Sequence, residues 1–278
     1  MAVIENQVVL ITGCSSGIGR GLALEFAASG HRVIATARRL ESIEDLADDR
    51  IYILQLDVTD EKSIEKAVNC AQGLCGRIDI VVNNAGYALI GPVAELDLDD
   101  LRTQFETNVV GVVGVIRAVV PQMLDRRSGR IVNIGSVSGV TATPFGGAYC
   151  GTKAAVHLIS DALRMEMAPF GIQVITVQPG AIESQFGNRA AQGVDQYREG
   201  SRYSPVYDSI EARADASQVG SMPALDFARQ VVDAVMGASP PAIIRAGKHS
   251  VRLPAMARLP SAIRDRIFSR RFGLDRLQ

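Results

Sequence analysis

The chain has 278 residues, of which 47% are hydrophobic and 21% are charged. This balance is typical of a folded globular protein with enough apolar material for a core, and the length fits one large α/β domain or two small ones. The formal net charge of −1 excludes the strongly basic character of most nucleic-acid-binding proteins, so we expect no nucleic acid as a partner.

Cysteine usage and the apolar runs bear on the cellular setting. The four cysteines form no CxxC pair, and the chain begins without a basic segment followed by an apolar one. We therefore expect reduced thiols in a cytoplasmic protein. The longest apolar stretch, residues 109–120, is interrupted by Arg117 and is too short to span a bilayer, so no transmembrane segment is expected. Three scattered histidines predict no metal site.

Taken in chain order, short apolar runs rich in β-branched residues alternate with longer amphipathic stretches. The pattern predicts strands at residues 8–11, 31–36, 51–56, 78–82, 130–134 and 172–177, and helices at 18–29, 42–47 and 61–74. Gly30 is placed to end the first helix. Nearly continuous apolar strands alternating with helices predict an α/β fold, a single-domain Rossmann-type doubly wound parallel sheet with helices on both faces. No linker rich in Pro, Gly or Ser divides residues 1–278, so we expect one domain with its core at about 5–250.

Two segments depart from this alternation. Residues 181–223 are polar and weakly periodic with interleaved aromatic residues, which is typical of a lid or substrate loop, the alternative being a surface excursion without function. Residues 258–278 carry six arginines and two aspartates with apolar residues between them. This predicts a basic helical tail whose apolar side docks on the body or on another subunit, with a peripheral membrane contact as the alternative.

A glycine-rich turn directly follows the first predicted strand. Its glycines are spaced G-x-x-x-G-x-G, and a predicted helix begins within it. Such a turn lets the backbone approach a pyrophosphate closely, and the helix points its free N–H groups at the anion. We therefore expect a dinucleotide to contact Gly13, Ser15, Ser16, Gly17, Ile18 and Gly19.

The end of the second predicted strand bears on the choice between NAD and NADP. An NAD-selective site places Asp or Glu there to bind the ribose 2′-hydroxyl, but residues 36–39 read Thr-Ala-Arg-Arg. A guanidinium binds a 2′-phosphate through charge-assisted hydrogen bonds, so Arg38 predicts NADP (NADPH) as the cofactor, with NAD disfavoured. The alternative is that Arg38 and Arg39 are solvated charges that open a helix.

A phenol and an ammonium group are spaced to share one face of a helix. Tyr149 and Lys153 lie four residues apart, and Ser136 follows the strand predicted at residues 130–134. A nearby ammonium stabilises phenolate and lowers the pKa of a tyrosine. A group with such a pKa can exchange a proton at neutral pH, which predicts acid–base catalysis by Tyr149.

Together these motifs resemble the short-chain dehydrogenase/reductase family over roughly residues 5–235. The matching features run in order along the chain: the turn at residues 12–19, Leu-Asp-Val-Thr at 56–59, Asn-Asn-Ala-Gly at 83–86, Asn108, Ser136, Tyr149 with Lys153, and Pro179-Gly180. The resemblance implies that Tyr149 is the acid in carbonyl reduction and the base in alcohol oxidation. It also implies that Lys153 lowers the pKa of Tyr149 and binds the nicotinamide ribose. Ser136 would hold the substrate oxygen, and Asn108 would support a water in the proton relay.

Further cofactor contacts are implied by the same resemblance. They are Asp57 and Val58 at the adenine, Asn84, Ala85 and Gly86 at the ribose, and Pro179, Gly180 and Ile182 at the nicotinamide. Many relatives carry Thr shortly after Pro-Gly. In this chain Ser184 stands in for it, and Glu183 adds a charge near the mouth of the site.

Residues 109–120 would be assigned to a strand on propensity, but the family implies a long helix there, and we expect the helix. Gly111 and Gly114 on it would allow close helix–helix approach, which predicts a homo-oligomer.

The sequence is less specific about the substrate than about the cofactor. Residues 35–38, the long segment after Pro179 and the basic tail resemble the branch that contains 17-beta-hydroxysteroid dehydrogenase-like enzymes and acyl-dihydroxyacetone-phosphate reductases. This implies a small-molecule carbonyl or alcohol substrate of apolar character, such as a steroid, retinoid or lipid-derived carbonyl. Phe145, Ile182, Phe186 and the tyrosines of residues 181–223 are candidates for its pocket. The alternative function is a non-catalytic NADP-binding redox sensor.

Overall fold

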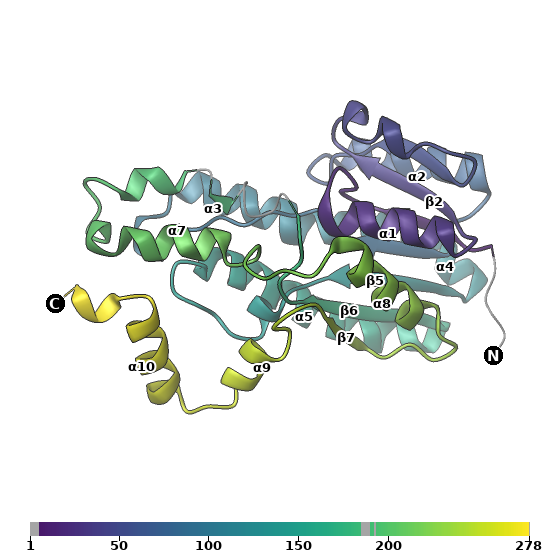
Figure 1. Ribbon diagram of the computed structural model, residues 1–278. Helices are drawn as coiled ribbons and strands as arrows, with labels where there is room; N and C mark the ends of the chain where they lie inside the picture. Colours follow the sequence, from purple (N-terminus) through teal and green to yellow (C-terminus); the bar gives the residue numbers. More distant parts are fainter. Residues whose placement is uncertain (1–5, 185–189, 192, 278) are drawn as a thin grey trace.

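The computed structural model describes residues 6–184, 190–191 and 193–277. A parallel sheet of seven strands in the order β3-β2-β1-β4-β5-β6-β7 runs through the molecule (Figure 1). Its strands are β1 (Val8–Ile11), β2 (Arg32–Ala37), β3 (Ile51–Gln55), β4 (Ile80–Asn83), β5 (Gly129–Ile134), β6 (Ile172–Pro179) and β7 (Ile243–Ala246). The predicted α/β doubly wound fold is confirmed, because the order reverses at β1 and every pairing is parallel.

Helices cover both faces of this sheet. They are α1 (Gly17–Ala28), α2 (Glu61–Cys75), α3 (Leu98–Phe105), α4 (Gly111–Arg126), α5 (Gly147–Met167), α7 (Tyr207–Asp215), α8 (Ala224–Met236), α9 (Arg252–Met256) and α10 (Ser261–Arg271). The α1 and α8 side chains, such as Phe26 and Phe227, pack on one face. The α2 and α4 side chains, such as Ile64 and Val115, pack on the other. Because both faces are covered, the central strands are apolar throughout rather than alternating.

The segment at residues 109–120 is helical, as the family resemblance implied. With α3 and a π-helical turn it forms one helical stretch, Leu98–Arg126, which has the length and composition of a membrane span. That stretch is longer than the apolar run at residues 109–120, which by itself is too short to span a bilayer. Its α4 part packs Val115, Val119 and Met123 into the core, which is the position of a helix that covers a sheet.

The two glycines of α4 do not have the role expected for them. A Cβ at Gly111 would lie 2.8 Å from the Val58 carbonyl oxygen, and one at Gly114 would lie 3.1 Å from Ile64 Cδ1. Both glycines therefore allow close packing within the chain, against α2 and the segment before it. They give no support to a subunit interface.

Local departures from the predicted elements occur where short-range patterns are weak. The helix expected at residues 42–47 is two short 3₁₀ turns, Leu40–Ser42 and Glu44–Leu46. The segment 181–223 is more regular than expected, since it contains two 3₁₀ turns and α7. Strand β7 was not predicted, because its four residues alternate between exposed and buried at the sheet edge.

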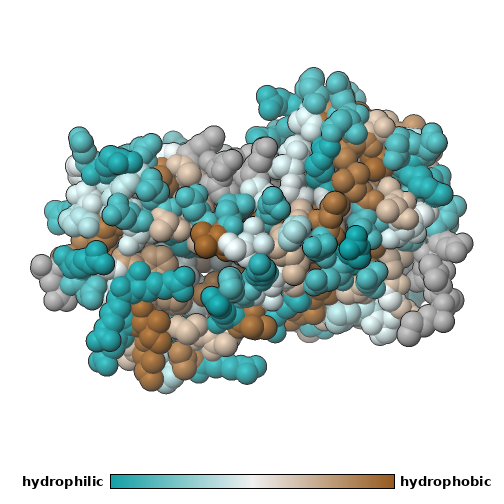
Figure 2. Space-filling model, viewed as in Figure 1, coloured by the Kyte–Doolittle hydropathy of each residue, from teal (hydrophilic) through white to brown (hydrophobic). Residues whose placement is uncertain are grey.

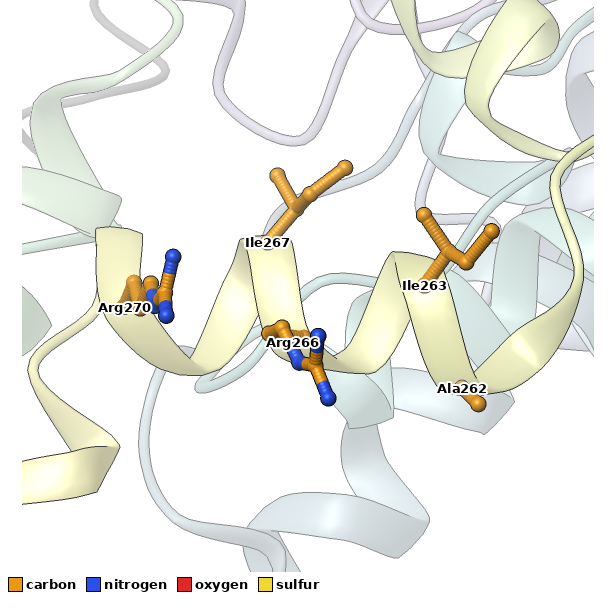
Figure 3. Close-up of a pocket in the computed structure, with 5 residues that line it drawn as sticks. All are labelled: Ala262, Ile263, Arg266, Ile267 and Arg270. Carbon is orange, nitrogen blue, oxygen red and sulfur yellow. The ribbon is translucent and has the colours of Figure 1, made fainter.

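The basic tail forms α10 and docks on the body by its C-terminal end. Phe268 and Phe272 are buried, whereas Ile263 and Ile267 are exposed. Apolar surface is visible over this lobe in Figure 2. The two isoleucines project from the same side of α10 and line a shallow groove together with Ala262, Arg266 and Arg270 (Figure 3). None of these lining residues is a predicted site residue, so the groove is separate from the predicted chemistry.

Candidate active site

The predicted site residues gather at the carboxyl edge of the sheet. The loops after β1, β4, β5 and β6 all begin there, because parallel strands end at a common edge. The topological switch point lies between β1, which leads into the glycine turn, and its neighbour β4, which leads into residues 84–86. Ligands of doubly wound folds bind at this point.

The glycine turn closes tightly on the neighbouring loops. Gly13 adopts φ +75°, and a Cβ there would lie 2.9 Å from the Cα of Ala85. Gly17 adopts φ +56°, and a Cβ there would lie 2.5 Å from the Cβ of Ser184. Predicted cofactor residues from three loops therefore meet at this turn. The side chain of Ser16, the N-cap of α1, makes no capping hydrogen bond, so the first N–H groups of α1 stay available to an anion.

Asn84 has a bracing role that the resemblance did not specify. Its amide donates to the carbonyl oxygens of Thr12 (2.9 Å) and Gly13 (3.0 Å). The Thr12 hydroxyl in turn accepts from the backbone N–H groups of Asn84 and Ala85, both at 3.0 Å. These bonds hold the loop after β4 against the loop after β1. The amide nitrogen of Asn84 thus shapes the cofactor cradle.

Arg38 and Asp57 lie at the ends of β2 and β3 on the same edge. Arg38 is exposed. Its backbone carbonyl accepts a hydrogen bond from Gln55 Nε2 at 2.9 Å, and its guanidinium takes no part in that bond. The Asp57 carboxylate accepts from the Thr59 hydroxyl at 2.8 Å and from the Thr59 N–H at 3.0 Å. Val58 is buried against Gly111. The Asp57 carboxylate is therefore oriented by its hydrogen bonds to Thr59, and the packing of Val58 against Gly111 supports the same turn.

Of the residues at and after the end of β6, Ser184 and Gly180 fit against neighbouring loops, whereas Ile182 packs into the core. Ser184 lies beside Gly17 and is bonded by its N–H to Gln218 Oε1 at 3.1 Å. Gly180 fits against the backbone of Lys248, since a Cβ there would meet the Lys248 carbonyl oxygen at 2.1 Å. Ile182, by contrast, is 3% exposed and packs into the core on the α1 side of the sheet. Its proposed place in the apolar substrate pocket was wrong.

Tyr149, Lys153 and Ser136 come together as predicted. Tyr149 and Lys153 share one face of α5, and the Lys153 ammonium lies 5.9 Å from the centre of the Tyr149 ring. Lys153 Nζ donates to the Ile134 carbonyl at 2.8 Å. The Ser136 hydroxyl accepts from the Ser138 N–H at 3.0 Å and is also hydrogen bonded with the Tyr149 side chain. The loop after β5 and the helix α5 therefore bring the Ser136 hydroxyl, the Tyr149 phenol and the Lys153 ammonium close together.

Burial governs the acid–base properties of this group. Burial raises the pKa of Tyr149 to about 12, and hydrogen bonding with Ser136 and the charge of Arg213 offset only part of that rise. Burial also lowers the pKa of Lys153 to about 8. The expected lowering of the Tyr149 pKa by Lys153 is therefore not found, because desolvation of the phenolate outweighs the neighbouring charges. At neutral pH the phenol is protonated.

Asn108 joins the site through an irregular turn of helix. It lies on the π-helical turn Glu106–Val110, a feature frequent at functional sites. Its amide donates to the Tyr87 carbonyl (2.8 Å) and to Thr152 Oγ1 (3.1 Å), and its oxygen accepts from the Tyr87 N–H (3.0 Å). A Cβ on Gly86 would meet Asn108 Oδ1 at 3.0 Å and Lys153 Nζ at 3.7 Å. Asn108, Gly86 and Lys153 are thus neighbours.

His157 is a site residue that sequence reasoning missed. It follows Tyr149 and Lys153 at four-residue spacing on α5, and its Nε2 accepts from the Ser136 N–H at 3.3 Å. A Cβ on Gly135 or Gly139 would lie within 2.7 Å of its ring. The helical spacing alone is a usable signal, whereas from the sequence the three histidines are expected to be surface or capping residues rather than metal ligands.

An aromatic cluster adjoins Tyr149. Phe145 contacts Tyr203 and Phe272 edge-on, with ring centres 6.0 Å apart in each pair. These three side chains and Tyr149 belong to one apolar cluster. Phe145 adopts φ +62°, an unusual backbone for a bulky residue. Its predicted pocket partners Tyr197 and Tyr207 lie in the same cluster, and Phe186 lies outside the described residues. Within the described part of the chain, no group of His, Cys, Asp and Glu is arranged to hold a metal.

Comparisons with known proteins identify the family of this chain. The family model for short chain dehydrogenase matches residues 7–195. The chain belongs to the short-chain dehydrogenase family. An oxidoreductase of Botryotinia fuckeliana is 37% identical over 191 residues, which cover 67% of this chain and 70% of the relative.

Solved structures extend the similarity over most of the chain. A short-chain dehydrogenase from Streptomyces avermitilis has 34% identity and a TM-score of 0.79, covering 91% of this chain and 92% of its own. Serine dehydrogenase complexed with NADP+ has 31% identity and a TM-score of 0.73, with coverage of 87% and 94%. A Burkholderia phymatum family member in complex with NAD shares the fold at 24% identity and a TM-score of 0.78, with coverage of 93% and 94%. Structural neighbours of this chain therefore bind NADP or NAD.

Proposed function

We propose that this protein interconverts a carbonyl and a secondary alcohol by hydride transfer with NADP(H), and that Tyr149 exchanges the proton. The observation that carries the proposal is the meeting of Tyr149, Lys153, Ser136 and Asn108 beside the glycine turn. A module that only binds a dinucleotide has no need of a buried phenol held between a serine hydroxyl and a lysine.

The residues present fit a bound dinucleotide phosphate. The uncapped N-terminus of α1 and the turn at Gly13 and Gly17 would hold the pyrophosphate. Arg38, at the end of a strand without a carboxylate, would bind the 2′-phosphate, which supports NADP over NAD. Lys153 would hydrogen-bond the nicotinamide ribose. When bound, the cofactor supplies or accepts the hydride.

The chain itself positions the substrate oxygen and handles the proton. In carbonyl reduction, the protonated Tyr149 donates its proton to the oxygen as the carbonyl carbon gains the hydride. Ser136 hydrogen-bonds the same oxygen and holds it at the phenol. Asn108 fixes the backbone of Tyr87, and the preceding Gly86 lies beside Lys153. In alcohol oxidation the phenolate takes the hydroxyl proton, so oxidation is expected to be faster at alkaline pH.

The aromatic cluster supports an apolar substrate. Phe145, Tyr203 and Phe272 come from three separate segments and form one apolar cluster with Tyr149, in which Tyr203 is partly exposed. This is the character expected for steroid-, retinoid- or lipid-like carbonyl compounds, and it agrees with the branch resemblance of the sequence.

The test compares the wild type with Tyr149→Phe. We expect the variant to lose at least about a hundredfold in NADPH consumption on apolar ketones, because general acid catalysis contributes on that order. Its affinity for NADPH should be unchanged, as measured by fluorescence titration of the bound nicotinamide. Normal turnover in the variant would remove Tyr149 from the mechanism. Tight NADPH binding without turnover in the wild type would favour the redox sensor.

A further inference from the structure

Arg213 reaches from the segment after β6 to the start of α5, near Tyr149. It lies on α7, and its Nε donates to Thr143 Oγ1 at 2.8 Å. Its Nη2 lies 2.7 Å from the point where a Cβ on Gly146 would stand. The guanidinium therefore rests on the bare backbone of Gly146, which is the N-cap of α5.

This position brings a fixed positive charge close to the reacting group. Tyr149 is in the first turn of α5, three residues after Gly146, and the charge of Arg213 is one of the influences that lower the pKa of Tyr149. The first turn of α5 has no side-chain cap, and the positive end of its helix dipole lies at the same place. Arg213 and the start of α5 thus favour negative charge next to Tyr149.

In the part of the chain that the structure describes, this charge has no acidic partner within ion-pair distance. Arg198, on the same segment, is by contrast paired with Asp195 at 3.3 Å and with Glu211 at 4.0 Å. A guanidinium held by only its Nε keeps its two terminal nitrogens for a planar pair of anionic oxygens.

We infer that Arg213 binds an anionic group of the substrate, a carboxylate or a phosphate ester, while Tyr149 and Ser136 hold its carbonyl or hydroxyl oxygen. The inference rests on the proposed function and narrows its substrate to a keto or hydroxy compound with an acidic end and an apolar body. The apolar body would pack against the aromatic cluster of Phe145, Tyr203 and Phe272, of which Tyr203 is partly exposed.

Two variants remove the contact by different routes, and a third controls for charge. Arg213→Met deletes the guanidinium and keeps a side chain of similar length. Gly146→Ala keeps the arginine and displaces it, because the new Cβ takes up the space of Nη2; Gly146 has φ −112°, which alanine adopts without strain. Arg202→Met removes an exposed arginine of the same segment. Thermal unfolding shows whether each variant is folded.

The experiment measures NADPH-dependent reduction of keto acids that differ in the spacing between carbonyl and carboxylate, each paired with its neutral methyl ester, and of matching keto phosphates. We expect the wild type to prefer one anionic compound over its neutral partner. Arg213→Met should raise KM for that compound about ten- to a hundredfold, the worth of a hydrogen bond between charged groups, and leave the ester within about threefold. Gly146→Ala should act in the same direction, and Arg202→Met should have no effect.

An equal loss on the acid and on its ester would overturn the inference, because Arg213 would then act only by holding α7 or by its influence on the pKa of Tyr149. A wild type that prefers no anionic compound overturns it as well. Calorimetric titration of the same acids into the protein–NADP+ complex separates the two proposals. Acid binding that is lost in Arg213→Met, without any turnover, sustains the inference and rejects the proposed reaction. Equal turnover of esters and acids would sustain the proposed reaction and reject the inference about Arg213.

Discussion

At the scale of single residues, burial governs the acid–base state of the candidate catalytic groups. Tyr149 and Lys153 have their pKa values moved toward the neutral forms, since both side chains are enclosed by protein. A spacing of four residues tells which groups share a helix face but not how much water reaches them. The sequence therefore predicted the partners correctly and their electrostatics incorrectly.

His157 should make the stability of the protein depend on pH. Burial, the Lys153 ammonium and Arg245 lower its pKa to about 4, with Asp161 opposing them. The unfolded chain then binds more protons between about pH 6.5 and 4, so the free energy of unfolding should fall as the pH falls through that window. His157→Gln keeps an acceptor for the Ser136 N–H without titrating. Urea unfolding at several pH values should show a flatter profile for this variant; an unaltered profile would assign the acid sensitivity to other groups.

Arg38 should determine cofactor preference. In Arg38→Asp, the carboxylate repels a 2′-phosphate and accepts a hydrogen bond from a 2′-hydroxyl. We expect the ratio of NADPH to NADH affinity to fall about ten- to a hundredfold, from the loss of a charge-assisted hydrogen bond. Arg50→Asp, at an exposed arginine before β3 and therefore at the opposite edge of the sheet, is the control for charge. An unchanged ratio in Arg38→Asp would mean that the 2′-phosphate is recognised elsewhere.

At the scale of elements, the segment after β6 is positioned by contacts that no local pattern contains. Tyr197 packs against Gly91, and Glu95 accepts from the Ser201 hydroxyl at 2.6 Å and from the Arg202 N–H at 3.1 Å. These bonds join residues more than a hundred positions apart in the chain. The segment is therefore ordered over most of its described length, despite its weak periodicity.

Gly91→Ala tests this docking. A Cβ at Gly91 would lie 2.4 Å from the Tyr197 hydroxyl and 2.6 Å from its Cζ, and the ring is buried. We expect overpacking to destabilise the protein by about 1–3 kcal/mol and to raise amide exchange in residues 193–215. Gly73→Ala is the control, since a Cβ there meets no atom within 4 Å. Unchanged exchange in residues 193–215 would show that Tyr197 is not what holds the segment.

At the scale of the whole molecule, exposed apolar side chains point to self-association. On α5, Leu158 is 71% exposed and Met165 is 63% exposed, and their seven-residue spacing places them on one face. The glycines of α4 no longer support an interface, but this face of α5 does.

We expect the protein to be a homo-oligomer in solution and Leu158→Glu combined with Met165→Glu to reduce its mass to that of a monomer. Light scattering after size-exclusion chromatography measures this, with Val251→Glu, exposed elsewhere, as the control. A wild type of monomeric mass at micromolar concentration contradicts the expectation.

The sequence by itself determined the layers of the fold and the main residues of the candidate site. Apolar strands and amphipathic helices are local patterns, and the glycine turn, Tyr149 with Lys153, and Ser136 are each read within a few residues. Only the tertiary structure decided which side chains face the site from a distance. Ile182 entered the core, Asn84 became a brace, and His157 and Arg213 reached Ser136 and Gly146. These outcomes depend on contacts between segments far apart in sequence, and on the desolvation that such contacts create, which no short window of the chain contains.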